Sequence, residues 1–135
     1  MTYTLLSLTQ EKPLREISIP WTVVNSCEHK ALRLTSIVDT GTSHTAIALR
    51  HAQALGLQPV GTLPINDKDG AAVPYPLYRV DLVFSRQCFI RDQVVVGLPL
   101  PAEDMLLGMD VLSQCRFVMG KAQDGKYIAQ ITVDV

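Results

Sequence analysis

The feature that most constrains this fold is the repeated alternation of apolar and polar residues over short segments. In Leu14–Val24 every second position is apolar, at Ile17, Ile19, Trp21 and Val23. This is the period of a half-buried β-strand. Further short apolar segments follow at Ala31–Val38, Gly61–Ile65, Val73–Phe84, Phe89–Val96, Met105–Leu107, Arg116–Met119 and Tyr127–Val135. Turn residues such as Asn66–Gly70 and Gln123–Gly125 separate several of them, which predicts a mostly β fold.

Two segments have a helical composition instead. Thr45–Leu55 contains good helix formers, and Gly56 after it suits a helix C-terminus, with Pro59 beyond. Asp110–Ser113 predicts a second, shorter helix. The chain has 135 residues and no internal repeat or linker. We therefore expect one domain over residues 1–135, mostly β, with one or two short helices.

Composition excludes several classes of protein. Apolar residues make up 47% and charged residues 19%, which is a globular composition. The formal net charge of -1 gives no basic patch for nucleic acid or for an anionic membrane. No apolar run is long enough to cross a bilayer, and the N-terminus has no signal-peptide pattern. These features predict a soluble cytoplasmic protein with neither a nucleic-acid nor a membrane partner.

The three cysteines, Cys27, Cys88 and Cys115, are far apart and form no Cys-x-x-Cys pair. A zinc knuckle or a redox motif is therefore not indicated. We expect buried free thiols in a reducing compartment.

One short motif can carry acid chemistry. Asp39-Thr40-Gly41 directly follows the apolar strand Ala31–Val38, so its carboxylate is expected at the rigid end of a buried strand. Gly41 permits close backbone approach to that carboxylate, and Thr40 and Thr42 add hydroxyl groups. The tripeptide alone is a weak signal, because Asp-x-Gly turns end strands in many folds.

A single carboxylate cannot act as acid and base at once. Two carboxylates placed close together by a two-fold axis cannot both ionise, so they share one proton and titrate in two steps. One of them can then activate a water while the other protonates a substrate carbonyl. A chain with one such loop would complete this site by forming a homodimer.

A second motif lies downstream, where Leu106-Leu107-Gly108 precedes the predicted short helix. With both motifs in this order, the chain resembles the retropepsin-like aspartic proteases over about Ile17 to Phe117. It is most similar to the small cellular and bacterial members. The resemblance implies a closed β-barrel, a homodimer and an extended peptide or protein substrate. It also implies an enzyme without a metal or organic cofactor.

The resemblance also implies a role for each motif residue. Asp39 would be the catalytic carboxylate, and Thr40 would donate its hydroxyl across the dimer axis. Gly41 would contact the carboxylates and the substrate backbone, while Thr42 would support Asp39. The segment that completes the ψ-shaped arrangement beside this loop would be Leu106, Leu107 and Gly108.

The implied flap and dimer contacts depart from the retroviral pattern. The flap would lie at Ile65–Tyr75 with its tip near Asp69 and Gly70, where charged residues stand in place of a glycine-rich tip. Ser43 and Met109 occupy the places of an acidic residue and an arginine that tie many retroviral dimers together. Because both are replaced together, neither leaves an unpaired charge, and the chain fits a non-retroviral branch.

Other interpretations of the same residues are weaker. Ser43-His44 lacks the Gly-x-Ser-x-Gly elbow of a serine hydrolase. His44 and His51 do not have a zinc-site spacing, so we expect surface or supporting roles. Asn66–Gly70 lacks the ligands of an EF-hand at its ends. Glu103-Asp104 is expected to be a solvated acidic pair.

Three functional hypotheses follow from these motifs. The first is an aspartic endopeptidase that acts as a homodimer with a shared catalytic water. The second is a retropepsin-like dimerisation or peptide-binding module with little or no proteolysis. The third is a half-site that a different chain completes.

Overall fold

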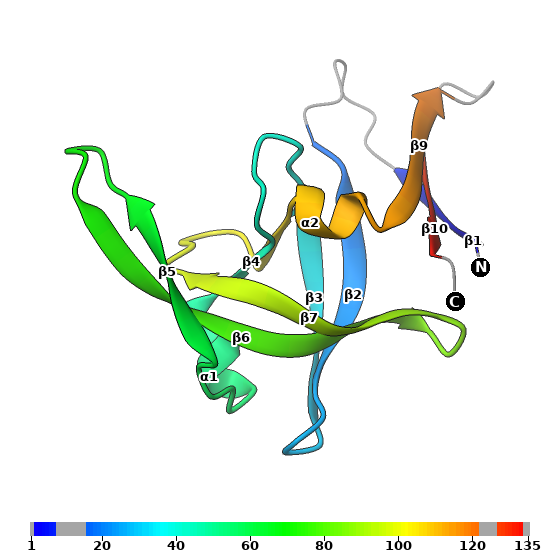
Figure 1. The fold of residues 1–135 in the computed structure, drawn as a ribbon. Helices are drawn as coiled ribbons and strands as arrows, with labels where there is room; N and C mark the ends of the chain where they lie inside the picture. Colours follow the sequence, from blue (N-terminus) through cyan, green and yellow to red (C-terminus); the bar gives the residue numbers. More distant parts are fainter. Residues whose placement is uncertain (1, 8–15, 122–126, 134–135) are drawn as a thin grey trace.

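The computed structural model describes residues 2–7, 16–121 and 127–133. Within them the strands are β1 (Thr2–Ser7), β2 (Ser18–Asn25), β3 (Lys30–Val38), β4 (Ala46–Ala48), β5 (Gly61–Asn66), β6 (Ala72–Ser85), β7 (Cys88–Leu98), β8 (Met105–Leu107), β9 (Cys115–Lys121) and β10 (Tyr127–Val133). The helices are α1 (Leu49–Ala54) and α2 (Met109–Leu112) (Figure 1).

The central feature of the fold is a closed β-barrel. Its strands follow the order β2-β3-β8-β4-β7-β6, and pairing of β2 with β6 closes the ring. The β3–β8 and β4–β7 pairs are parallel, whereas the other pairs are antiparallel. β5 lies outside the ring and pairs only with β6 among the described residues. The mostly β fold and the closed barrel predicted from the sequence are confirmed.

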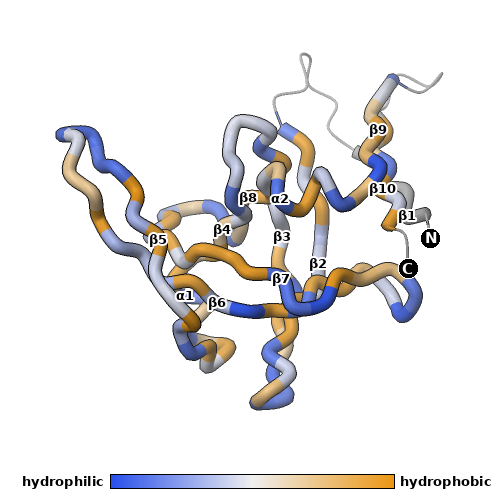
Figure 2. Tube along the Cα trace, in the orientation of Figure 1, coloured by the Kyte–Doolittle hydropathy of each residue, from blue (hydrophilic) through white to orange (hydrophobic). Residues whose placement is uncertain are grey.

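The alternating apolar residues fill the barrel as their period predicts. Ile19, Trp21 and Val23 on β2 are at most 1% exposed. Trp21 stacks on Phe84 of β6, with ring centroids 3.7 Å apart. In Figure 2 the hydrophobic colour runs along the barrel strands, and the hydrophilic colour marks the far end of the β5–β6 hairpin. This core provides the fixed frame on which the acidic loop is mounted.

The predicted helix at Thr45–Leu55 is wrong in its first half. Ala46–Ala48 forms the strand β4, and α1 begins only at Leu49. All three residues of β4 are buried, because the strand pairs with β7 on one side and with β8 on the other. Pairing on both sides inside the barrel overrides the local helix propensity. Gly56 follows the helix at a φ of 68°, which agrees with the predicted C-terminal glycine.

The two ends of the described chain form a separate sheet in the order β1-β10-β9. The two strands of the predicted C-terminal hairpin are present as β9 and β10. The turn expected at Gln123–Gly125 lies outside the described residues. β9 is an edge of this sheet, which leaves one side of its backbone without a neighbouring strand among the described residues.

The three cysteines form no disulfide bond, but they are not all buried as predicted. Cys88 is buried inside the barrel and Cys115 is half-buried, whereas Cys27 is exposed. Cys27 lies in the turn after β2, where its backbone N–H donates to the Asn25 side chain. Burial raises the pKa of the Cys88 thiol, an effect that a backbone hydrogen bond to Val133 partly offsets, so this thiol is protonated at neutral pH.

Candidate active site

The acidic loop begins where β3 leaves the barrel. β3 runs parallel to β8, with Val38 opposite Leu107. The backbone N–H of Asp39 donates to the Leu107 carbonyl at 2.9 Å, and that of Val38 donates to the Ile17 carbonyl at the same distance. Asp39 is half-buried. The backbone on which its carboxylate is mounted is therefore fixed by two neighbouring segments.

The carboxylate is oriented by its own loop. Asp39 Oδ1 accepts the backbone N–H of Gly41 at 3.0 Å. A Cβ at Gly41 would lie 3.2 Å from the same oxygen, so a side chain there would crowd the carboxylate. Thr40 and Gly41 are exposed at the tip of the loop, whereas Thr42 is half-buried. This geometry fits the expected use of glycine as the residue that lets the backbone approach the acid.

The predicted partner segment, Leu106-Leu107-Gly108, does lie against this loop. The backbone N–H of Met109 donates to the Thr42 carbonyl at 2.9 Å. A Cβ at Gly108 would lie 2.8 Å from the carbonyl carbon of His44 and 3.0 Å from Thr45 N. These are backbone atoms that cannot rotate away, so Gly108 is required by close packing. The structure thus brings together two motifs that are more than sixty residues apart in the sequence.

A buried polar network behind the loop was missed by the sequence analysis. Thr45 is 0% exposed, and its hydroxyl lies 2.7 Å from Asp110 Oδ1. The backbone N–H of Thr45 lies 3.0 Å from each oxygen of the same carboxylate. The only signal in the sequence was one threonine before β4 and one aspartate in a short helix. A threonine and an aspartate that are 65 residues apart in a sequence give no sign that they form a hydrogen-bonded pair.

The predicted flap corresponds to the hairpin of β5 and β6. Its turn is closed by Asp67, whose N–H donates to the Ala71 carbonyl at 2.8 Å. Asp67 Oδ1 accepts the N–H groups of Asp69 and Ala71, each at 2.9 Å, and Gly70 has a φ of 81°. The prolines Pro64 and Pro74 face each other where β6 has β5 as its only neighbour, as expected for an edge.

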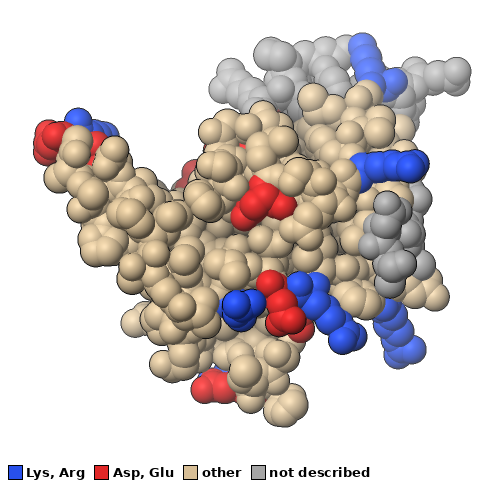
Figure 3. Space-filling view, viewed as in Figure 1, with Lys and Arg blue, Asp and Glu red and all other residues tan. Residues whose placement is uncertain are grey.

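The hairpin stands apart from the rest of the molecule. In Figure 1 it projects beyond the barrel, and its tip lies away from the acidic loop that follows β3. Figure 3 shows a hollow between the hairpin and the body, with charged side chains gathered at the tip, where the sequence has Asp67, Lys68 and Asp69. The structure therefore places Asp69 and Gly70 at the tip of an overhanging hairpin, and not in contact with Asp39.

Asp104 is not the solvated residue that the sequence analysis expected. Its carboxylate lies 2.7 Å from His51 Nε2 and 3.5 Å from the Arg50 guanidinium, and it accepts the Thr35 N–H at 3.1 Å. Partial burial alone would raise the pKa of Asp104, but the Thr35 N–H, His51 and Arg50 together hold it below the usual value. His51 thus has a supporting role: it helps to attach the loop before β8 to α1.

The same loop is attached to α1 at further points. Arg50 donates to the carbonyl oxygens of Leu100 and Glu103, the latter at 3.0 Å. The backbone N–H of Ala48 donates to the Asp104 carbonyl at 2.9 Å. Contacts from β4 and α1 therefore fix the loop that leads into β8, and with it the segment beside the acidic loop.

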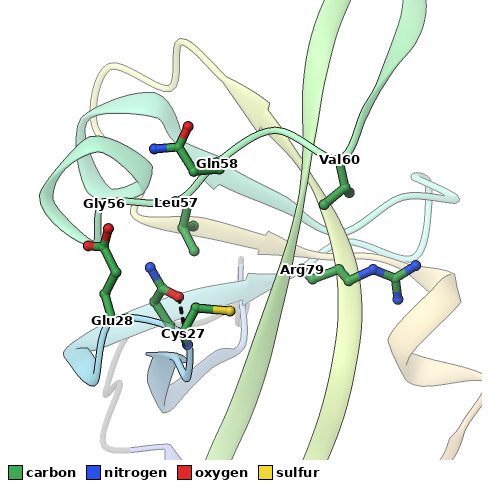
Figure 4. A pocket seen from close by; sticks show the side chains of 8 residues that line it. Cys27, Glu28, Gly56, Leu57, Gln58, Val60 and Arg79 are labelled. Carbon is green, nitrogen blue, oxygen red and sulfur yellow. Dashed lines mark hydrogen bonds between the residues drawn. The ribbon is translucent and has the colours of Figure 1, made fainter.

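A separate hollow of about 210 Å³ lies beside the turn that joins β2 to β3, at the end of the hairpin that is far from the acidic loop. Its walls come from the turn after β2, the loop after α1 and β6 (Figure 4). Its lining residues are Asn25, Cys27, Glu28, Gly56, Leu57, Gln58, Val60 and Arg79. The acidic loop follows the other end of β3, so this hollow contributes nothing to it.

The described part of the chain contains neither a metal-binding cluster nor a helix that could span a membrane. No group of three or more His, Cys, Asp or Glu side chains there is arranged to hold a metal ion. No helix within the same residues is long and apolar enough to span a membrane.

The comparisons with known proteins agree with the geometry of the loop. A family model for gag-polyprotein aspartyl proteases matches residues 27–114, which is more than half of the chain. This chain belongs to the retropepsin-like aspartic protease family. The matched range includes both the Asp39 loop and the Leu106-Leu107-Gly108 segment. A search of curated proteins gives no match.

Solved structures support the retropepsin-like fold. A retropepsin-like aspartic protease from Rickettsia conorii is 18% identical, with a TM-score of 0.63, and the match covers 99% of this chain and 95% of that one. The EIAV protease, solved with an inhibitor, is 15% identical with a TM-score of 0.56. That match covers 78% of this chain and 92% of the viral one. At these identities the likeness establishes the fold of a retropepsin.

Proposed function

We propose that this chain is an aspartic endopeptidase that acts as a homodimer, with Asp39 of each chain as a catalytic carboxylate. The observation that carries the proposal is the preorganised acid: Asp39 Oδ1 accepts the Gly41 N–H at 3.0 Å while Leu107 holds the backbone behind it. Membership of an aspartic protease family supports it. One chain provides one carboxylate of this kind, so the site is half-built.

The proposed mechanism uses the pair of carboxyl groups around one water. Two carboxylates at close distance share a proton, because both cannot ionise together. The ionised member takes a proton from the water as it attacks the scissile carbonyl carbon, and the protonated member donates to the carbonyl oxygen. Thr40 would donate its hydroxyl across the axis and Thr42 would support the loop. Neither a metal nor an organic cofactor enters any step.

An exposed surface supports the homodimer. Thr40 and Gly41 are exposed in the single chain, although they flank the acid. Met109 beside the loop is 42% exposed, and Val118 and Met119 on the edge strand β9 are 60% and 63% exposed. An apolar edge strand is prone to pair with another strand. In the proposed dimer a second copy covers this region, with the two Asp39 loops facing each other.

Substitutions that introduce positive charge on β9 test the proposed dimer. Val118→Lys combined with Met119→Lys is expected to shift the chain to monomers and to lower peptide cleavage in parallel. Val60→Lys is the matched control, because Val60 is also exposed, at 53%, but lies at the other end of the barrel beside the separate hollow. Light scattering after size exclusion measures the mass. A wild-type chain that is strictly monomeric while cleaving peptides contradicts the homodimer.

The proposed substrate is an extended peptide or protein segment. The hollow between the β5–β6 hairpin and the body offers a place for it, and backbone pairing with the hairpin would hold it as an added strand. Asp69 and Gly70 at the hairpin tip would then cover the substrate. The cytoplasmic location expected from the sequence stays a prediction.

Substitution of the proposed catalytic residue tests the activity. Asp39→Asn is expected to abolish peptide cleavage while circular dichroism and dimer mass stay those of the wild type. The control is Asp92→Asn, since Asp92 is exposed on β7 at a φ of 54°, a conformation that Asn tolerates. Cleavage by the purified Asp39→Asn protein contradicts the proposal. A wild-type dimer that binds peptides without cutting them supports the peptide-binding module instead.

A further inference from the structure

The buried Thr45 and the half-buried Asp110 form a pair that closes the far end of the acidic loop. We propose that these two are positioning residues for the reaction, which fix where the Asp39 carboxylate stands relative to its partner in the dimer. The inference rests on the proposed aspartic protease function. It concerns two side chains that do not touch the reacting atoms and that no sequence motif singled out.

The hydrogen bonds of this pair have a defined direction. A carboxylate is only an acceptor, so the Thr45 hydroxyl donates to Asp110 Oδ1 across 2.7 Å. The hydroxyl oxygen then accepts the Gly108 N–H at 3.0 Å. The Thr45 N–H also points at the carboxylate, 3.0 Å from each oxygen. One side chain therefore joins the end of the loop to both Gly108 and Asp110.

Asp110 is held in turn by donors from its own side. Its Oδ1 accepts the Val111 N–H at 2.8 Å, and its Oδ2 lies 3.4 Å from the Gln93 amide nitrogen. The Gln114 amide donates to Gln93 Oε1 at 2.8 Å and to the Asp110 carbonyl at 2.9 Å. None of the ion pairs found among the described residues involves Asp110. Donors from α2, β7 and the end of the acidic loop therefore fix the rotamer of Asp110.

The consequence for Asp39 follows from the way in which the loop is attached at three points. The loop is attached at its start by Asp39 N–H to Leu107, at its middle by Thr42 to Met109, and at its end by Thr45. Release of the end lets Gly41 and the carboxylate that it binds shift together. A displacement of about 1 Å between reacting groups can cost roughly 100-fold in rate. The pair is therefore expected to act on kcat, through the spacing of two carboxyl groups.

Removal of the hydroxyl group alone is the sharpest test. Thr45→Val keeps the shape of the side chain but leaves the Gly108 N–H without its acceptor and removes one of the donors to the Asp110 carboxylate. We expect kcat to fall roughly 10- to 100-fold with KM little changed. Thr45→Ser keeps the hydroxyl and is expected to restore kcat to near the wild-type value. Activity is expressed per folded dimer, with near-UV circular dichroism and dimer mass measured on each variant.

The pH profile separates positioning from a purely structural role. If the two Asp39 carboxyl groups move apart, their coupling weakens, and the acidic and basic limbs of the kcat/KM profile move toward each other. Loss of folded protein alone lowers the whole curve and leaves both limbs in place. Among the described residues, Asp110 is the titratable side chain that contacts the end of the loop from another element, and His44 is an exposed residue of the loop itself. Both remain in Thr45→Val.

A second variant keeps the test open if Thr45→Val does not fold. Asp110→Asn keeps the size of the side chain and leaves the Thr45 hydroxyl as acceptor for Gly108. Its amide puts an NH2 group in the place of one carboxylate oxygen, where that donor would face the N–H of Thr45 and the amide of Gln93. We therefore expect kcat to fall by about 10-fold, with the same convergence of the two limbs of the pH profile. Wild-type kcat and an unchanged pH profile in the variant that folds overturn the inference.

If Asp39→Asn is inactive at the same time, the proposed function stands. If Asp39→Asn cleaves peptides, the proposed function fails as well.

Discussion

The acidic loop and the β5–β6 hairpin are both turns that leave a barrel strand, yet they are held in opposite ways. The loop from Asp39 to Thr45 is attached at its start to β8, and at its middle and end to α2. The hairpin is closed only by its own ladder and by the Asp67 carboxylate. The loop is therefore held by other segments of the chain, whereas the hydrogen bonds found in the outer part of the hairpin all lie within the hairpin.

This difference corresponds to two tasks. A general acid and base must stand within hydrogen-bonding reach of the reacting atoms, so its support has to be rigid. A cover over an extended substrate must open for entry and product release. The loop has its partners on β8 and α2, whereas the hairpin presents charged residues to solvent at its exposed tip.

The largest expected effect comes from filling the space between the loop and its support. Gly108→Ala places a methyl group 2.8 Å from a backbone carbon of His44, so the loop must move. We expect a loss of about 1–3 kcal/mol in unfolding free energy and roughly 100-fold in kcat/KM. Denaturant melts at fixed concentration and peptide cleavage measure the two effects.

The matched change on the hairpin is Gly61→Ala. Its Cβ would meet nothing closer than Leu77 Cδ1 at 3.7 Å, which is ordinary contact. Unfolding free energy and kcat/KM are expected to stay within about 0.5 kcal/mol and two-fold of the wild type. Equal losses in both alanine variants would remove the distinction between the two regions.

A smaller effect is expected at the hairpin turn. Asp67→Ala removes the acceptor for the N–H groups of Asp69 and Ala71, so the tip becomes less ordered before substrate binds. The added ordering cost is expected to raise KM by about three-fold, with kcat and unfolding free energy almost unchanged. Lys68→Ala on the same turn is the control. A fall in kcat without a rise in KM would show that the turn belongs to the rigid part of the site.

The sequence predicted what depends on local pattern or on a known motif. The two-residue period predicted most of the barrel strands, and the two motifs predicted that the Asp39 loop and Gly108 lie side by side, as they do. The catalytic role of Asp39 stays a prediction. The strand at Ala46–Ala48 was not predicted, because its conformation is imposed by β7 and β8 and its own residues favour a helix. The hydrogen-bonded pair of Thr45 with Asp110, and that of His51 with Asp104, were missed for a related reason. Each pair joins distant positions, and their contact exists only after the barrel closes.

The smallest expected effect concerns the loop before β8. Neighbouring donors and cations lower the pKa of Asp104, so the folded state holds its charge more strongly than the unfolded chain. That stabilisation is complete above about pH 4, the unfolded value, and is lost as pH falls through the folded pKa. The difference in unfolding free energy between wild type and Asp104→Asn should therefore shrink below about pH 4. Glu103→Gln is the control, and a difference that stays constant with falling pH contradicts this role.

The most direct test of the central claim is to mix wild-type chains with Asp39→Asn chains. Suppose that each site needs one Asp39 from each of two chains, and that one equivalent of the variant is added. The number of dimers then doubles, and after subunit exchange one quarter of them contain two wild-type chains. Cleavage is expected to fall to about half, and to fall further as more variant is added. Unchanged cleavage at every ratio would show that one chain carries the whole site, and would contradict the account.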